Sequence, residues 1–101
     1  MYLTRLRLDP SSLQARRDLS DAYEMHRTLV RAFVRTPDQA PPRILWRAEP
    51  AAAWSDPVVL VQSQEIGDWS VLEALPNYLK SKDGKSGVET RELNPEQWLH
   101  T

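Results

Sequence analysis

Residues 58–61, the run Val-Val-Leu-Val after Pro57, constrain the fold more than any other part of the chain. An unbroken run of β-branched and aliphatic residues next to a proline is typical of a central β-strand that is covered on its faces. The run is far too short to span a membrane. Residues 43–49 precede it and alternate apolar with polar side chains. The sequence therefore predicts an antiparallel hairpin inside a sheet.

A half-buried strand is predicted at residues 2–8, where leucines alternate with arginines. We expect this strand to be followed by a polar, arginine-bearing loop that reaches about Ser20. A helix comes next, because Asp21 is a typical N-cap and Glu24 stands at the spacing of a capping box. We expect Pro37 to end this helix. Its apolar face is formed by Ala22, Met25, Leu29, Ala32 and Phe33.

The alternation of apolar and polar residues that predicts secondary structure is weaker beyond Gly67. Residues 68–79 are expected to form a short helix or an irregular loop, residues 88–93 a fourth strand, and residues 94–99 a capped last turn. The predicted order is βαββαβ in a single domain. This order is that of the ferredoxin-like α+β sandwich, an antiparallel sheet with helices on one face.

Charge is unevenly distributed along the chain. The formal net charge is −1, yet residues 1–35 hold seven arginines and four acids, which leaves +3 with no lysine. Arginine binds phosphate through a planar fork, so this bias favours nucleic acid, although a solvated helix face explains it equally well.

The chain has no cysteine, which excludes disulfides and thiolate metal sites and is compatible with a reducing cytoplasm. We expect no signal peptide, because the chain starts with a strand pattern.

Tyr23 and His26 are the candidate catalytic residues. They stand one helical turn apart, with His26 at the rim of the apolar face and with Arg27 and Arg31 beyond Tyr23. Imidazole moves protons near neutral pH, and arginines stabilise charge on phosphate oxygens, so the set suits RNA cleavage by the ribose 2′-hydroxyl. We expect both rings to face a basic cleft that solvent can reach. A histidine held inside the fold for structural reasons remains the alternative.

Other motifs give weaker evidence for a function. Residues 84–86, Gly-Lys-Ser, lack the preceding glycine of a phosphate loop because position 79 is leucine, so a linker is the better interpretation. No acidic cluster or histidine pair stands at metal-ligand spacing, so we expect no metal and no cofactor. His100 lies too near the end to be catalytic. Trp46 and Trp69 are expected in or beside the core, whereas Trp54 lies in a connection and could be exposed.

Several spaced segments resemble one known family. Residues 1–6, 16–19 with 23–29, 44–47 with 49–50, and 58–64 followed by 68–70 are similar, in this order, to the CasE-type CRISPR repeat endoribonucleases of type I-E systems. The similarity runs to about Tyr78. It implies a ferredoxin-like domain at residues 1–79 that matches the N-terminal half of such an enzyme. Residues 80–101 form a divergent segment, with a fourth strand and a tail, and we expect the chain to be a truncated member.

The resemblance also implies an activity. These enzymes cut the CRISPR precursor RNA beside the repeat stem-loop without metal, leave a 2′,3′-cyclic phosphate, and stay with the RNA in the Cascade complex. His26 would be the acid–base group and Tyr23 would orient the phosphate. RNA would be bound by Arg16, Arg17, Arg27 and Arg31. The expected partners are repeat RNA and other Cascade subunits, with no DNA and no membrane, in the cytoplasm.

Two alternatives remain open. The chain could be a non-catalytic ferredoxin-like module that binds RNA or protein. It could also be an incomplete product whose apolar face lacks its partner.

Overall fold

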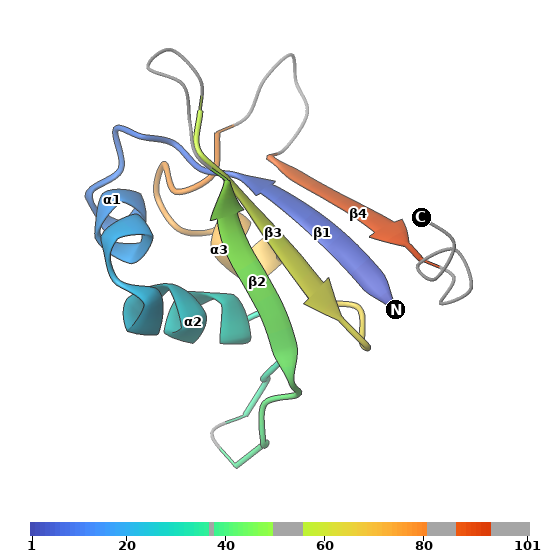
Figure 1. Cartoon of the computed structure of the whole chain (residues 1–101). Helices are drawn as coiled ribbons and strands as arrows, with labels where there is room; N and C mark the ends of the chain where they lie inside the picture. The colour runs from blue at the N-terminus through green and yellow to red at the C-terminus, as the bar shows by residue number, and fades with distance from the viewer. Residues whose placement is uncertain (37, 50–55, 81–86, 94–101) are drawn as a thin grey trace.

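The computed structural model describes residues 1–36, 38–49, 56–80 and 87–93. The elements follow the chain as β1 (Tyr2–Arg7), α1 (Leu13–Ser20), α2 (Ala22–Val30), β2 (Ile44–Glu49), β3 (Val58–Ser63), α3 (Ser70–Glu73) and β4 (Val88–Glu92). The four strands form one antiparallel sheet in the order β2-β3-β1-β4, and the helices lie on one side of it (Figure 1). The predicted ferredoxin-like α+β fold is confirmed.

The sheet register separates two faces. In the central strand β1, Thr4 and Leu6 face the helices, and their partners Val61 and Val59 in β3 do the same. The predicted hairpin of β2 and β3 is confirmed, and β3 is an inner strand as expected. One part of that prediction is wrong: helices cover only one face, so the alternate residues of β3 at 58, 60 and 62 remain half-buried.

A single core lies between the sheet and the helices. Its fully buried members come from β1 and the residue just after it, both long helices, β3, α3 and the segment after α3, namely Leu6, Leu8, Ala15, Met25, Leu29, Val59, Val61, Leu72 and Tyr78. The rings of Phe33 and Trp69 meet edge to face, with centroids 5.5 Å apart. Trp69 is buried and Trp46 is half-buried, as predicted. Each buried aliphatic side chain stabilises the fold by about 1.5–3 kcal/mol.

Helix α1 corrects a prediction, because residues 13–20 were expected to be a loop. The Ser12 hydroxyl caps this helix and accepts a hydrogen bond from the Ala15 N–H at 3.1 Å. Residues 13–19 are mostly good helix formers, and this helix buries Ala15 and Asp18. The first crossover of the fold therefore contains two helices.

Helix α2 begins where the sequence predicted. The Asp21 carboxylate accepts hydrogen bonds from the N–H groups of Tyr23 and Glu24 at 3.0 and 3.4 Å. The capping box is only half formed, because the Asp21 N–H donates to the Asp18 carbonyl instead of to the Glu24 side chain. The regular helix ends at Val30, before the predicted stop at Pro37, and residues 31–33 continue as tighter turns. Ala22 is exposed, whereas the rest of the predicted apolar face is buried.

The later elements are short. A short helix or an irregular loop was expected for residues 68–79, and the structure has a helix there, α3, of only four residues. The predicted fourth strand is confirmed as β4. The last turn expected at 94–99, the Gly-Lys-Ser segment at 84–86, Trp54 and His100 all lie outside the described residues. Within the part of the chain that the structure describes, no helix has the length and apolar character that crossing a membrane requires.

Candidate functional site

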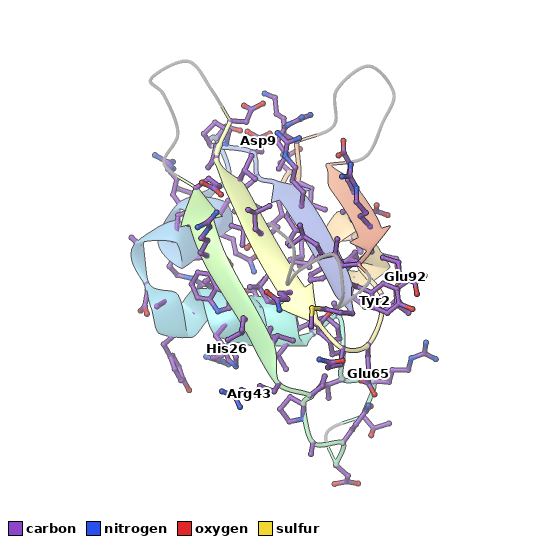
Figure 2. All side chains as sticks on the ribbon, turned by 45° about the vertical axis from the view of Figure 1, so that its right-hand side comes forward. Tyr2, Asp9, His26, Arg43, Glu65 and Glu92 are labelled. Carbon is purple, nitrogen blue, oxygen red and sulfur yellow. The ribbon has the colours of Figure 1, made fainter. Side chains whose placement is uncertain are left out.

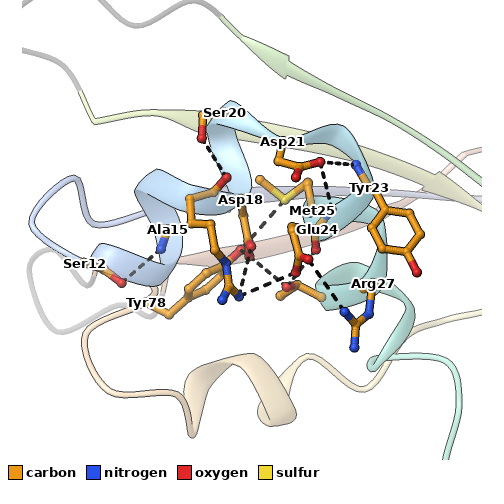
Figure 3. A network of polar contacts seen from close by, with 12 residues as sticks. Ser12, Ala15, Asp18, Ser20, Asp21, Tyr23, Glu24, Met25, Arg27 and Tyr78 are labelled. Carbon is orange, nitrogen blue, oxygen red and sulfur yellow. Dashed lines mark hydrogen bonds and ion pairs between the residues drawn. The ribbon is translucent and has the colours of Figure 1, made fainter.

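A buried carboxylate ties the two long helices together. The side chain of Asp18, in α1, is fully buried. Its Oδ2 accepts hydrogen bonds from the hydroxyl of Thr28 in α2 and from the phenol of Tyr78, both at 2.7 Å (Figure 3). The three residues come from α1, α2 and the chain after α3, so this contact fixes how α2 sits on the fold.

Tyr78 stays a hydrogen-bond donor in this cluster. Burial of the phenol, together with the hydrogen bond to Asp18 and the negative charge of that residue, raises the pKa of Tyr78 well above its ordinary value. The preceding residue, Asn77, has φ of 55°, a left-handed conformation that asparagine tolerates better than most residues. The turn at Asn77 thus brings Tyr78 back toward Asp18.

A chain of charged side chains runs from this cluster to the surface of α2. The second Asp18 oxygen, Oδ1, has no hydrogen-bond donor among the described residues, and Arg17 Nη2 lies 3.6 Å from it. The same Arg17 atom lies 3.8 Å from Glu24 Oε2, and Glu24 Oε1 lies 3.6 Å from Arg27 Nη1. The Arg27 guanidinium carbon stands 5.8 Å from the centre of the Tyr23 ring.

Tyr23 and His26 both lie on the exposed side of α2. Tyr23 is 69% exposed, and His26 is exposed as well, outside the folded core (Figure 2). The His26 imidazole makes no hydrogen bond or ion pair with any residue that the structure describes. The alternative of a structural histidine held inside the fold is therefore wrong. A reacting group could approach both rings from solvent.

The cleft predicted around this pair stays a prediction. The best-formed hollows of the described surface lie on the sheet and beside the end of α2, and neither Tyr23 nor His26 lines them. No group of three histidine, cysteine or acidic side chains within residues 1–36, 38–49, 56–80 and 87–93 could hold a metal ion.

The four candidate RNA-binding arginines are all exposed on the helical layer. Arg16 and Arg17 belong to α1 and Arg27 to α2, whereas Arg31 caps the C-terminus of α2. The structure brings Arg17 and Arg27 together around Glu24, but Arg16 and Arg31 form no ion pair with a described residue. Glu24 was considered from sequence only as a capping residue.

Sequence reasoning missed the buried cluster. Asp18 stands three residues after Ala15, the spacing of one helical face, and this was the available signal for a buried side chain on α1. Its link to Tyr78, sixty residues away, has no local signature.

The open face of the sheet is partly apolar. Leu45 in the edge strand β2 is 57% exposed, and it lines a shallow hollow together with Leu3, Leu60 and Arg47. This hollow lies on the side of the sheet away from α2, so it is separate from Tyr23 and His26.

Comparisons with known proteins agree with the resemblance found in the sequence. A CRISPR-associated endoribonuclease Cse3 of Thermus thermophilus is 53% identical over 73 residues, which are 72% of this chain and 35% of that protein. A solved CRISPR-associated protein from Thermus thermophilus superposes with a TM-score of 0.71 at 43% identity, covering 94% of this chain and 46% of the other. Thermus thermophilus Cse3 bound to an RNA that represents a pre-cleavage complex superposes with a TM-score of 0.69 at 42% identity, covering 93% and 42%.

The chain thus spans less than half the length of these relatives. The family model described as CRISPR associated protein matches residues 1–99, almost the whole chain. The chain therefore belongs to the family of CRISPR associated proteins.

Proposed function

We propose that this chain carries the catalytic helix of an endoribonuclease that processes CRISPR repeat RNA. The observation that carries the proposal is the pair of exposed side chains on α2, Tyr23 and His26, beside an arginine pair. The identity to an endoribonuclease and the match to RNA-bound relatives support it.

The chemistry needs two proton transfers. A base removes the proton from a ribose 2′-hydroxyl, the oxygen attacks the adjacent phosphorus, and an acid protonates the leaving 5′-oxygen. The products are a 2′,3′-cyclic phosphate and a 5′-hydroxyl. We assign a proton transfer to His26, an effect of typically 10²–10⁴-fold for one positioned group. The scheme asks for no metal, because the nucleophile is the hydroxyl of the substrate.

Tyr23 and the arginines would hold the substrate. The exposed phenol of Tyr23 can donate a hydrogen bond to a non-bridging phosphate oxygen one turn from His26. Phosphates of the RNA would be bound by the exposed side chains of Arg16, Arg17, Arg27 and Arg31.

We also propose that the product RNA stays bound within Cascade, in the cytoplasm. The division of the chain at residue 79 stays a prediction.

Cleavage of a repeat stem-loop in EDTA tests the proposal. We expect the 101-residue chain to release a product that ends in a cyclic phosphate. His26→Ala should lower the rate at least about 100-fold while RNA affinity changes less than about threefold. His100→Ala is the matched histidine control and should cut like the parent chain.

Two results would contradict this assignment. Equal cutting by His26→Ala and the parent chain would remove His26 from the reaction. Binding of the stem-loop by the parent chain without any cleavage would favour the non-catalytic RNA-binding module instead.

A further inference from the structure

Two arginines from different helices share one carboxylate. Arg17 in α1 and Arg27 in α2 lie 3.8 and 3.6 Å from separate oxygens of Glu24. A carboxylate with one oxygen on each guanidinium presents the charge and geometry that two non-bridging oxygens of a phosphodiester would present. The Glu24 carboxylate therefore lies between the two guanidinium groups, with one oxygen toward each.

Each arginine is also held without Glu24. Arg17 lies 3.6 Å from the buried Oδ1 of Asp18, which has no hydrogen-bond donor among the described residues. Arg27 lies over the ring of Tyr23 at 5.8 Å, within the range of a cation–π contact. If the Glu24 carboxylate moved away, both guanidinium groups would keep an anchor near the gap it leaves.

The Glu24 contacts are weak enough to be displaced. Both are longer than a hydrogen bond, and the side chains of Arg17 and Arg27 are 57% and 60% exposed. Ion pairs exposed to this degree contribute little to folding stability. The Glu24 side chain is 26% exposed, so it can turn toward solvent without unfolding of α2. Its backbone N–H remains held by the Asp21 cap.

We propose that Arg17 and Arg27 form a binding site for one phosphodiester of RNA, and that the Glu24 carboxylate occupies this site until RNA displaces it. The choice of RNA as the ligand rests on the proposed function. Glu24 then acts as a built-in competitor that weakens non-specific binding of polyanions. Because Tyr23 contacts Arg27, a phosphate in this site would lie at the start of the catalytic helix.

Replacing one charge tests the proposal. The probe is a labelled repeat stem-loop with a 2′-deoxyribose at the cleavage position, so that binding is measured by anisotropy without cutting. We expect Glu24→Gln to bind about threefold to tenfold tighter than the parent chain, because the competing charge is lost. Glu73→Gln is the matched control. It changes net charge equally, and Glu73 in α3 forms no ion pair with a described residue. Its effect should stay below twofold.

A double variant locates the effect. In an Arg27→Gln background, Glu24→Gln should gain less than twofold, because half of the phosphate site is gone. Glu24→Ala repeats the test with a different side chain, and circular dichroism melting shows whether each variant folds.

Weaker binding by both Glu24 variants would overturn the proposal and make Glu24 a residue that positions the arginines. An effect equal to that of Glu73→Gln would overturn it too. Cleavage of an unmodified stem-loop by the parent chain is measured separately, so failure of the nuclease assignment and failure of this site give different results.

Discussion

The residues of the candidate site and those of the buried Asp18 cluster differ in how well the sequence predicts them. Tyr23 and His26 form a local pattern on one helix, and both are exposed as the nuclease prediction requires. The contact between Asp18 and Tyr78 has no such pattern, because it joins residues that are sixty positions apart. Helical spacing predicts which residues share one face of a helix. It cannot predict which residues from a distant part of the chain will contact that face.

The Asp18 cluster gives a stability prediction. Tyr78→Phe removes one of the two donors to Asp18 Oδ2 and leaves a buried oxygen underpartnered. We expect the free energy of unfolding at pH 7, measured in urea, to fall by about 1–3 kcal/mol. Tyr2→Phe is the control, since the half-buried Tyr2 phenol has no hydrogen bond to a described residue. An equal cost for both variants would contradict the role of this cluster.

The same variant has a pH signature. The pKa of Tyr78 is raised in the folded chain, so its phenol keeps its proton there while the unfolded chain releases it above about pH 10. Stability that comes from this phenol is therefore complete below about pH 10 and is lost as the pH rises further. The difference between the parent chain and Tyr78→Phe should shrink above that pH, and a constant difference would contradict the assignment.

At the scale of elements, strands were easier to predict than helices. Period-two alternation and the run at 58–61 predict β1, β2 and β3, whereas the sequence pattern predicts a loop where α1 forms. The signal for α1 was present in Ser12, which caps the helix, but the polar composition of residues 13–20 concealed it. The end of α2 was placed too late, because the residues after Val30 keep apolar spacing while they tighten into turns.

Asp21 is the single residue between α1 and α2, and it is both the C-cap of α1 and the N-cap of α2. Its N–H closes the end of α1 and its carboxylate caps α2. We expect Asp21→Ala to lower the free energy of unfolding by about 0.5–2 kcal/mol, because the N-terminal cap of α2 is lost. Asp21→Asn keeps a capping oxygen and should stay within about 0.5 kcal/mol of the parent chain. Urea denaturation of the three proteins checks this, and an equal loss in both variants would show that charge matters more than the cap.

At the scale of the whole molecule, the element order was enough to predict the topology. Few arrangements of βαββαβ satisfy right-handed crossovers, and the sheet order observed is the ferredoxin-like one. The sequence did not show that one sheet face would stay uncovered. The continuous run in β3 was interpreted as buried on its faces, although only Val59 and Val61 reach the core.

Because only one face of the sheet is covered, leucines on its two faces should differ in how much they stabilise the fold. Leu6 in β1 is fully buried against the helices, whereas Leu45 in β2 lies on the open face and is 57% exposed. We expect Leu6→Ala to cost about 2–5 kcal/mol in urea denaturation, because it leaves a cavity in the core. Leu45→Ala should cost less than about 1 kcal/mol, because little apolar area is lost from contact. If both substitutions cost the same and the stability rises with protein concentration, a second copy covers the open face in solution, and the chain is then not a monomer with one exposed sheet face.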